Sequence, residues 1–107
     1  MIPTFIAEFS NMHGGDFEHA KDLIRAACDA GADVVKGQAY DNPQAIIDMG
    51  GSMPLEFYQQ CMFTVDQYLE LIEFGKQIGI DVFFTICSDN PDSKLTQILD
   101  KDCPSIS

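Results

Sequence analysis

A repeated junction between a helix and a strand most constrains the fold of this chain. A helical pattern ends at a glycine, an aspartate follows two residues later, and an apolar run begins. This occurs in Ala30-Gly31-Ala32-Asp33 and again, 48 residues on, in Ile78-Gly79-Ile80-Asp81. A glycine after the last turn is a common way to end a helix. Apolar strands that follow helices in this way indicate an α/β fold with parallel strands and crossover helices.

The spacing of apolar residues predicts three strands that alternate with helices. The expected elements are a strand over 2–7 ending at Glu8, a helix from an N-cap at Asp16 to Gly31, a strand over 33–38, a helix from a capping box at 64–67 to about Gln77, a strand over 81–85, a turn over 87–90, and a short helix that begins near Pro91. Right-handed crossovers would bring the carboxyl ends of the strands to one edge. Three strands cannot close a barrel, so residues 1–107 are expected to form the opening part of a larger unit.

The segment 39–63 is the least regular part of the pattern. Asn42-Pro43, Gly50-Gly51 and Met53-Pro54 interrupt it, and short helices fit over 43–49 and 54–62. An insertion of this length between a strand and its crossover helix is uncommon unless it has a function. We expect this segment to lie over the ends of the strands.

The charge balance limits the kinds of partner. The formal net charge of -11 argues against nucleic acid and against an anionic membrane surface. No apolar run is long enough to span a membrane, and the start lacks the features of a signal peptide. The 4 cysteines form no C-x-x-C pair and there are only 2 histidines, so a zinc site is not expected. A cytoplasmic protein with reduced thiols and small-molecule substrates is the resulting expectation.

Polar residues at the predicted strand ends are the first candidates for chemistry. Lys36 closes an apolar strand and is either a lysine reaching solvent or a clamp for a phosphate or carboxylate. Gln38 shares its face at a spacing of two and could add a directional hydrogen bond. Glu8 is either a surface group, a ligand for sugar hydroxyls or a general base.

Other candidates carry weaker signals. His13 lies in a loop before two glycines, where it is either a hydrogen-bonding loop residue or a catalytic group. The pair Gly14-Gly15 before a helix could present backbone N–H groups to an anion. Thr85 ends a predicted strand, and because threonine is common at strand ends this position alone is a weak signal of function. Cys87 is interpreted as a small filler, because no basic partner for a nucleophile is evident.

Several of these residues form motifs that resemble the sialic acid synthase family. The opening Ala7-Glu8-Phe9-Ser10, followed by His13 and Gly15-Asp16, is similar to the family's first motif, which usually has a branched apolar residue at the position of Phe9. The resemblance continues through most of residues 5–90, in the motifs Ala20-Lys21-x-Leu23-Ile24, Ala30-Gly31-Ala32-Asp33, Val35-Lys36-x-Gln38, and Ile78-Gly79-Ile80-Asp81 followed by Thr85.

The resemblance implies the N-terminal portion of a (β/α)8 barrel. It implies an enzyme, a transferase that condenses phosphoenolpyruvate with an N-acylated amino sugar such as N-acetylmannosamine or its 6-phosphate. Lys36 and Gln38 would contact phosphoenolpyruvate, Thr85 would lie on its phosphate or carboxylate side, and Glu8 would bind sugar hydroxyls. Lys36 and Glu8 would be the catalytic pair, with His13 among the substrate-binding residues. A divalent metal, typically Mn²⁺ in such enzymes, would take its ligands outside this chain, and the full-length protein would be a homo-oligomer.

Apart from Phe9, this sequence departs from the family pattern at three places. Met12 replaces an asparagine, Gly37 replaces a phenylalanine, and the family's Thr-Pro-Phe-Asp is Thr85-Ile86-Cys87-Ser88 here. Gly37 is expected to weaken its strand and to remove an aromatic packing group. Two other hypotheses stay open: a non-catalytic barrel fragment that needs a partner chain, and another phosphate-binding barrel such as a sugar-phosphate aldolase with Lys36 as its Schiff-base lysine.

Overall fold

The computed structural model describes residues 4–86 of the chain. The turn predicted over 87–90 and the helix predicted near Pro91 lie outside the described residues. The elements in chain order are β1 (Ile6–Ser10), α1 (Phe17–Asp29), β2 (Val34–Ala39), α2 (Pro43–Asp48), α3 (Leu55–Cys61), α4 (Val65–Ile78) and β3 (Asp81–Ile86).

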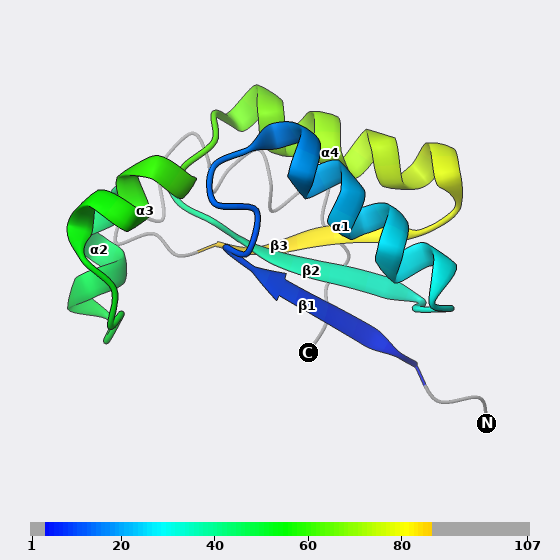
Figure 1. Ribbon diagram of the computed structural model, residues 1–107, viewed down its shortest axis with the longest axis horizontal. Coiled ribbons are helices and arrows are strands. Elements are labelled where there is room, and N and C mark those ends of the chain that lie inside the picture. Colours follow the sequence, from blue (N-terminus) through cyan, green and yellow to red (C-terminus); the bar gives the residue numbers. More distant parts are fainter. Residues whose placement is uncertain (1–3, 87–107) are drawn as a thin grey trace.

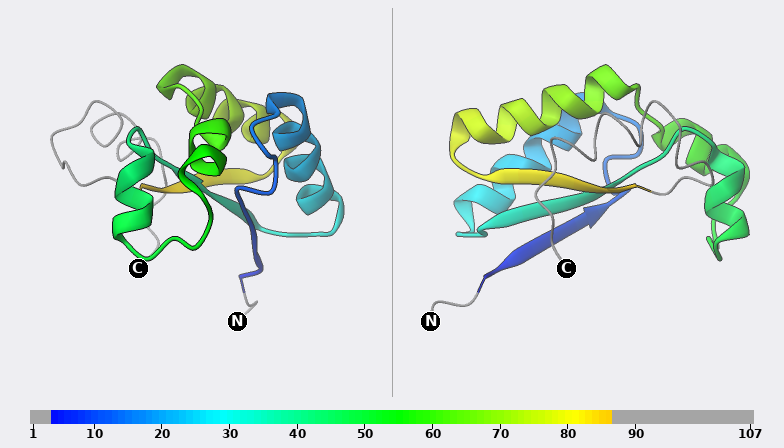
Figure 2. Two further views of the ribbon diagram at one scale, coloured as in Figure 1. Left: turned by 60° about the vertical axis from the view of Figure 1, so that its left-hand side comes forward. Right: turned by 180° about the vertical axis from the view of Figure 1, so that it is seen from behind.

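The strands form a 3-stranded parallel sheet in the order β1-β2-β3. Both crossover helices, α1 and α4, lie on the same face of this sheet (Figure 1). The view from behind shows the same two layers (Figure 2). Helices on a single face are the arrangement of a barrel wall, whereas a doubly wound sheet has helices on both faces. The predicted fold, the first part of a (β/α)8 barrel, is confirmed in the described residues.

The helix ends follow the signals in the sequence. The Asp16 carboxylate accepts the backbone N–H of His19 at 3.2 Å, which caps α1. Thr64 and Gln67 form the predicted capping box at the start of α4. Gly79 ends α4 with a φ of 97°, a left-handed conformation that glycine adopts without a steric penalty. The predicted helices around α1 and α4 are therefore confirmed to within one or two residues.

The first strand differs from its prediction. It was expected over 2–7 with its end at Glu8, but β1 begins at Ile6 and pairs with β2 as far as Ser10. Its register shifts between Glu8 and Ser10, and Ser10 has a φ of 50°. Phe9 causes this extension, because its ring is buried against the core and holds the backbone beside β2. Glu8 is therefore a residue within the strand.

Gly37 has a consequence opposite to the one expected from the sequence. An added Cβ at this position would lie 2.6 Å from the Phe9 ring and 3.1 Å from the Phe84 ring. The two rings contact each other edge-to-face with centroids 6.3 Å apart. Aromatic packing is not lost, since Phe9 on β1 occupies the space that a side chain on β2 would fill.

The insertion between β2 and α4 is ordered into the two predicted short helices, α2 and α3. They lie beyond the carboxyl ends of the strands (Figure 1). They have a small core of their own, in which the buried Tyr40 hydroxyl donates to the carbonyl oxygen of Tyr58 at 2.6 Å. The Gln60 side-chain amide donates to the Gly14 carbonyl oxygen at 2.7 Å. The insertion is thereby fixed to the loop that follows β1.

Candidate functional site

Four of the predicted site residues lie together on the face of the sheet that carries no helix. Side chains alternate along each strand, and Val35, Gly37 and Phe84 point into the core beneath the helices. Their neighbours along the strands therefore point to the opposite face. The register places Glu8 beside Lys36, and Gln38 beside Thr85. We call Glu8, Lys36, Gln38 and Thr85 the polar row.

Lys36 carries the one positive charge on the strands within residues 4–86. The other cations of that range, Lys21, Arg25 and Lys76, lie on helices. The Lys36 ammonium group is 5.9 Å from the centre of the Phe83 ring. In the described part of the chain it forms no ion pair with a carboxylate, although Glu8 is its neighbour across β1. A half-buried lysine without a protein counterion is well suited to hold an anionic ligand.

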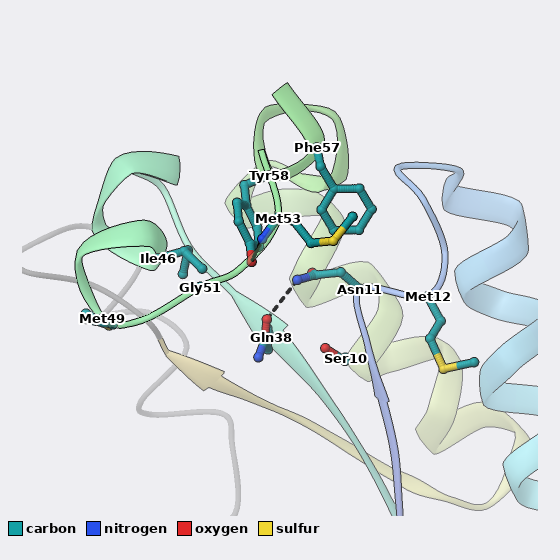
Figure 3. A pocket seen from close by; sticks show the side chains of 10 residues that line it. All are labelled: Ser10, Asn11, Met12, Gln38, Ile46, Met49, Gly51, Met53, Phe57 and Tyr58. Carbon is teal, nitrogen blue, oxygen red and sulfur yellow. Dashed lines mark hydrogen bonds between the residues drawn. The ribbon is translucent and has the colours of Figure 1, made fainter. Parts of the chain in front are cut away.

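A cavity of about 430 Å³ lies at the end of the polar row, between the loop after β1 and the two short helices (Figure 3). The strands and the loop contribute polar groups to it, and the insertion contributes mainly apolar ones. The lining residues are Ser10, Asn11, Met12, Gln38, Ile46, Met49, Gly51, Met53, Phe57 and Tyr58. Gln38 belongs both to the polar row and to this cavity, so the two form one continuous site.

Asn11 is the buried polar residue of the cavity, with only 6% of its surface exposed. Its amide nitrogen donates to the Gln38 carbonyl oxygen at 2.7 Å, a bond drawn in Figure 3. The side-chain carbonyl oxygen of Asn11, Oδ1, is buried and has no hydrogen-bond partner among residues 4–86. Sequence reasoning missed Asn11, because its partner is 27 residues away and no local pattern marks the pair. The interaction fixes the Gln38 carbonyl and leaves the Gln38 amide hydrogens to donate to a ligand.

The structure does not bring His13 into the polar row. Its side chain is buried and stacks on Phe63 with ring centroids 4.5 Å apart. Its Nδ1 accepts the backbone N–H of Gly15 at 2.9 Å. Burial, assisted by the nearby His19 and partly opposed by Asp16, lowers the pKa of His13 to about 4. This neutral, packed imidazole shapes the loop beside the cavity, and direct contact of His13 with a substrate stays a prediction.

His13 should make stability depend on pH in a defined window. Its pKa is about 4 in the folded chain against 6.5 ordinarily, so between these values the unfolded chain binds a proton that the folded chain excludes. The free energy of unfolding should fall as the pH drops through this window, by up to about 1.4 kcal/mol per pH unit. His13 should contribute no slope above it. Urea unfolding at several pH values measures this dependence.

The control for this measurement separates His13 from the carboxylates that also titrate in the window. His13→Phe should lack the His13 part of the slope, whereas His19→Gln, which changes an exposed helix residue, should keep most of it. Equal slopes in the wild type and His13→Phe would contradict a buried neutral imidazole.

Within residues 4–86, no group of three or more His, Cys, Asp or Glu side chains is placed to hold a metal ion. None of the helices in that range combines the length and apolar character needed to cross a membrane.

The fold and the polar row define a class, the opening part of a (β/α)8 barrel with polar side chains toward the carboxyl ends of its strands. No family model matches the chain. An uncharacterised protein of Methanocaldococcus jannaschii is 33% identical over 100 residues, which cover 92% of this chain and 28% of that protein. N-acetylneuraminate-9-phosphate synthases of Mus musculus and Homo sapiens are 36% and 35% identical over 95 residues, covering 78% of this chain and 26% of each synthase.

A solved structure gives the same result. The sialic acid synthetase of Leptospira borgpetersenii, crystallised with citrate, superposes with a TM-score of 0.71 at 30% identity. The match covers 94% of this chain and 34% of the synthetase. The resemblance to the sialic acid synthase family is thus confirmed, and this chain is a homologue of part of those enzymes. It spans only about a quarter to a third of the length of the relatives that it matches.

Proposed function

We propose that this chain supplies the phosphoenolpyruvate- and sugar-binding edge of a sialic acid synthase-like transferase. The reaction would join the enol carbon of phosphoenolpyruvate to the aldehyde carbon of an N-acylated amino sugar and release phosphate, giving a nonulosonic acid. The observation that carries this proposal is the placement of Lys36, without a carboxylate partner among residues 4–86, beside Gln38 and Glu8 on the helix-free face. Homology to sialic acid synthases supports the same reaction class.

Each residue of the polar row has a role in this proposal. The Lys36 ammonium group would hold the phosphate or carboxylate of phosphoenolpyruvate against the strongly negative charge of the chain. Gln38 would donate its amide hydrogens to the same ligand, since its carbonyl is held by Asn11. Thr85 lies beside Gln38 on β3 and would contact the other end of the anion. Glu8 is exposed one strand away and would accept hydrogen bonds from sugar hydroxyls.

We also propose a metal, a cellular location and an oligomeric state for this enzyme. A divalent metal, typically Mn²⁺ in the family that this chain resembles, would polarise the sugar aldehyde, and its ligands would come from outside residues 4–86, where no group of side chains is placed to hold it. We place the protein in the cytoplasm, in line with the free thiols of Cys28 and Cys61. A homo-oligomer of the full-length protein is part of the same proposal.

Replacing Lys36 tests the anion site. Lys36→Ala should weaken phosphoenolpyruvate binding by about 10- to 100-fold, the usual loss for one charge-assisted contact in a partly buried site. Isothermal titration calorimetry on the 107-residue chain measures the dissociation constant. Lys76→Ala is the matched control, because it removes an exposed lysine on α4 and should leave binding unchanged.

Two results would count against the proposal. Equal affinities of the wild type and Lys36→Ala would remove Lys36 from the anion site. A covalent adduct at Lys36 after borohydride treatment with a carbonyl substrate would instead favour a Schiff-base aldolase. In a polypeptide that holds these residues in a closed barrel, absence of nonulosonic acid with phosphoenolpyruvate, Mn²⁺ and amino sugars would contradict the condensation itself.

A second candidate function is that of a barrel piece which acts only after association. Within the described residues, β1 and β3 each pair on one side only, which leaves two open edges. Phe5 and Ile6 are exposed beside the first of them. Open parallel edges with exposed apolar side chains favour pairing with another chain. Size-exclusion chromatography with light scattering tests this, and a folded monomer over a wide concentration range would count against it.

A further inference from the structure

We infer that Asn11 is a positioning residue, which sets the direction in which the Gln38 amide faces and is kept for this purpose at a cost to the fold. This role rests on the proposed function and deepens it, because it concerns how Gln38 is prepared for an anion. A glutamine side chain can present to a ligand either its N–H donors or its carbonyl acceptor. Beside the Lys36 ammonium group, the donor end is the one that attracts a phosphate or carboxylate.

The hydrogen bond between the two side chains selects the donor end of Gln38. The Asn11 amide nitrogen donates to the Gln38 carbonyl oxygen at 2.7 Å. Figure 3 shows the Gln38 nitrogen on the side of that amide that is turned away from Asn11. Gln38 is half-buried, so without Asn11 its amide would be free to turn over and bond to water through either end. Asn11 therefore stops a rotation that an anion would otherwise have to stop on binding.

An irregularity in β1 brings Asn11 to this position. The register of β1 against β2 shifts between Glu8 and Ser10, with Phe9 as the extra residue. Ser10, immediately before Asn11, has a left-handed φ of 50°, a conformation that residues other than glycine adopt at a cost. Bulges of this kind commonly redirect a side chain next to a site. The bulge thus turns the chain so that Asn11 meets Gln38 across β2.

The main chain of Asn11 is held from two directions. Its backbone carbonyl oxygen accepts the backbone N–H of Gly14 at 3.1 Å and the thiol of Cys61 at 3.8 Å. Gly14 belongs to the same loop, whereas Cys61 is the last residue of α3. The Asn11 side chain therefore starts from a fixed backbone, which is what a residue that orients another side chain requires.

The Asn11 side chain lowers the stability of the fold that holds it. It is only 6% exposed, and its Oδ1 has no hydrogen-bond partner among residues 4–86. A buried acceptor without a partner is destabilising, and an apolar side chain of similar size removes that cost. Asn11→Leu should therefore leave the free energy of unfolding at or above the wild-type value. A residue that served only the fold would show a loss instead.

A double-mutant cycle for phosphoenolpyruvate affinity, measured by isothermal titration calorimetry on the 107-residue chain, tests this role. Asn11→Leu should weaken binding by about 2- to 10-fold, the cost of immobilising one flexible side chain. Gln38→Met removes the amide through which Asn11 acts, so adding Asn11→Leu to Gln38→Met should cause no further loss. Gln77→Leu, which removes an exposed amide on α4, is the control and should bind like the wild type.

Nitrogen-15 relaxation of the wild-type side-chain amides gives a second test that needs neither a variant nor a ligand. The Gln38 side-chain amide should be nearly as rigid as the backbone, whereas that of Gln77 should be mobile. Equal mobility of these two side chains would overturn the positioning role, even if Asn11→Leu does not fold.

The outcomes of the cycle separate this role from the proposed function. Equal affinity of the wild type and Asn11→Leu, with Lys36→Ala still binding more weakly, would overturn the role of Asn11 alone. A loss from Asn11→Leu that keeps its full size in Gln38→Met would also overturn it, because Asn11 would then act without Gln38. Failure of the wild type to bind phosphoenolpyruvate would overturn both proposals.

Discussion

Phe9→Ala is expected to lower the free energy of unfolding by about 3–5 kcal/mol, the usual cost of truncating a buried phenylalanine. The Phe9 ring is only 4% exposed and fills the space over Gly37, where the strand itself offers no side chain. Its loss would remove one of the two edge-to-face contacts of Phe84, leaving the one with Tyr68, and would open a cavity between the sheet and the helices. Urea unfolding followed by circular dichroism measures the change.

The same pair permits a sharper test by exchange. In the family pattern an aromatic residue stands at the position of Gly37 and a branched apolar residue at that of Phe9, so we interpret the two differences as compensating. Phe9→Ile and Gly37→Phe should each destabilise the chain, and the double variant should lose less than the sum, by at least about 1 kcal/mol. Phe5→Ala, at a side chain that is 51% exposed, is the control and should have little effect. Strict additivity of the two single changes would contradict the compensation.

Gly15→Ala should have an effect of similar size, for two reasons that act together. The backbone of Gly15 has a φ of 89°, and an added Cβ would collide with the backbone carbonyl of Gln60 on α3. The left-handed conformation alone costs a residue other than glycine about 1–2 kcal/mol. The collision adds to this, because a backbone carbonyl cannot move without displacing its helix. We therefore expect a loss of about 3 kcal/mol or more in the free energy of unfolding.

Gly14→Ala is the matched control for the collision. Gly14 also has a positive φ, 64°, but an added Cβ there has no heavy atom within 4 Å. It should therefore show only the conformational cost. Denaturant unfolding of both variants gives the difference between them, and equal losses would mean that α3 does not approach the loop at Gly15.

Local signals in the sequence were sufficient for most of the fold. Gly31 and Gly79 mark helix ends, and Thr64 with Gln67 marks a helix start, because these interactions involve residues within a few positions of one another. The end of β1 was mispredicted because Glu8 was taken as a terminal polar residue. What holds the strand beyond Glu8 is the burial of Phe9, which depends on contacts with distant parts of the chain.

The candidate site likewise has one part that local sequence patterns predict and one part that they do not. The polar row followed from the period of two along parallel strands and from the carboxyl edge that parallel strands share, so Lys36 and Gln38 could be predicted together. The cavity could not be predicted, because Asn11 meets Gln38 and the insertion only after the chain has folded. The burial of His13 against Phe63 depends equally on tertiary packing, and its loop position gave no sign of it.

We propose above all that the helix-free face binds phosphoenolpyruvate at the polar row. The most direct measurement is a titration of the ¹⁵N-labelled chain with phosphoenolpyruvate, followed by two-dimensional nuclear magnetic resonance. We expect saturable shifts centred on the backbone amides of Glu8, Lys36, Gln38 and Thr85, with the outer surfaces of α1 and α4 unchanged. Shifts confined to those helices, or none at millimolar ligand, would contradict it.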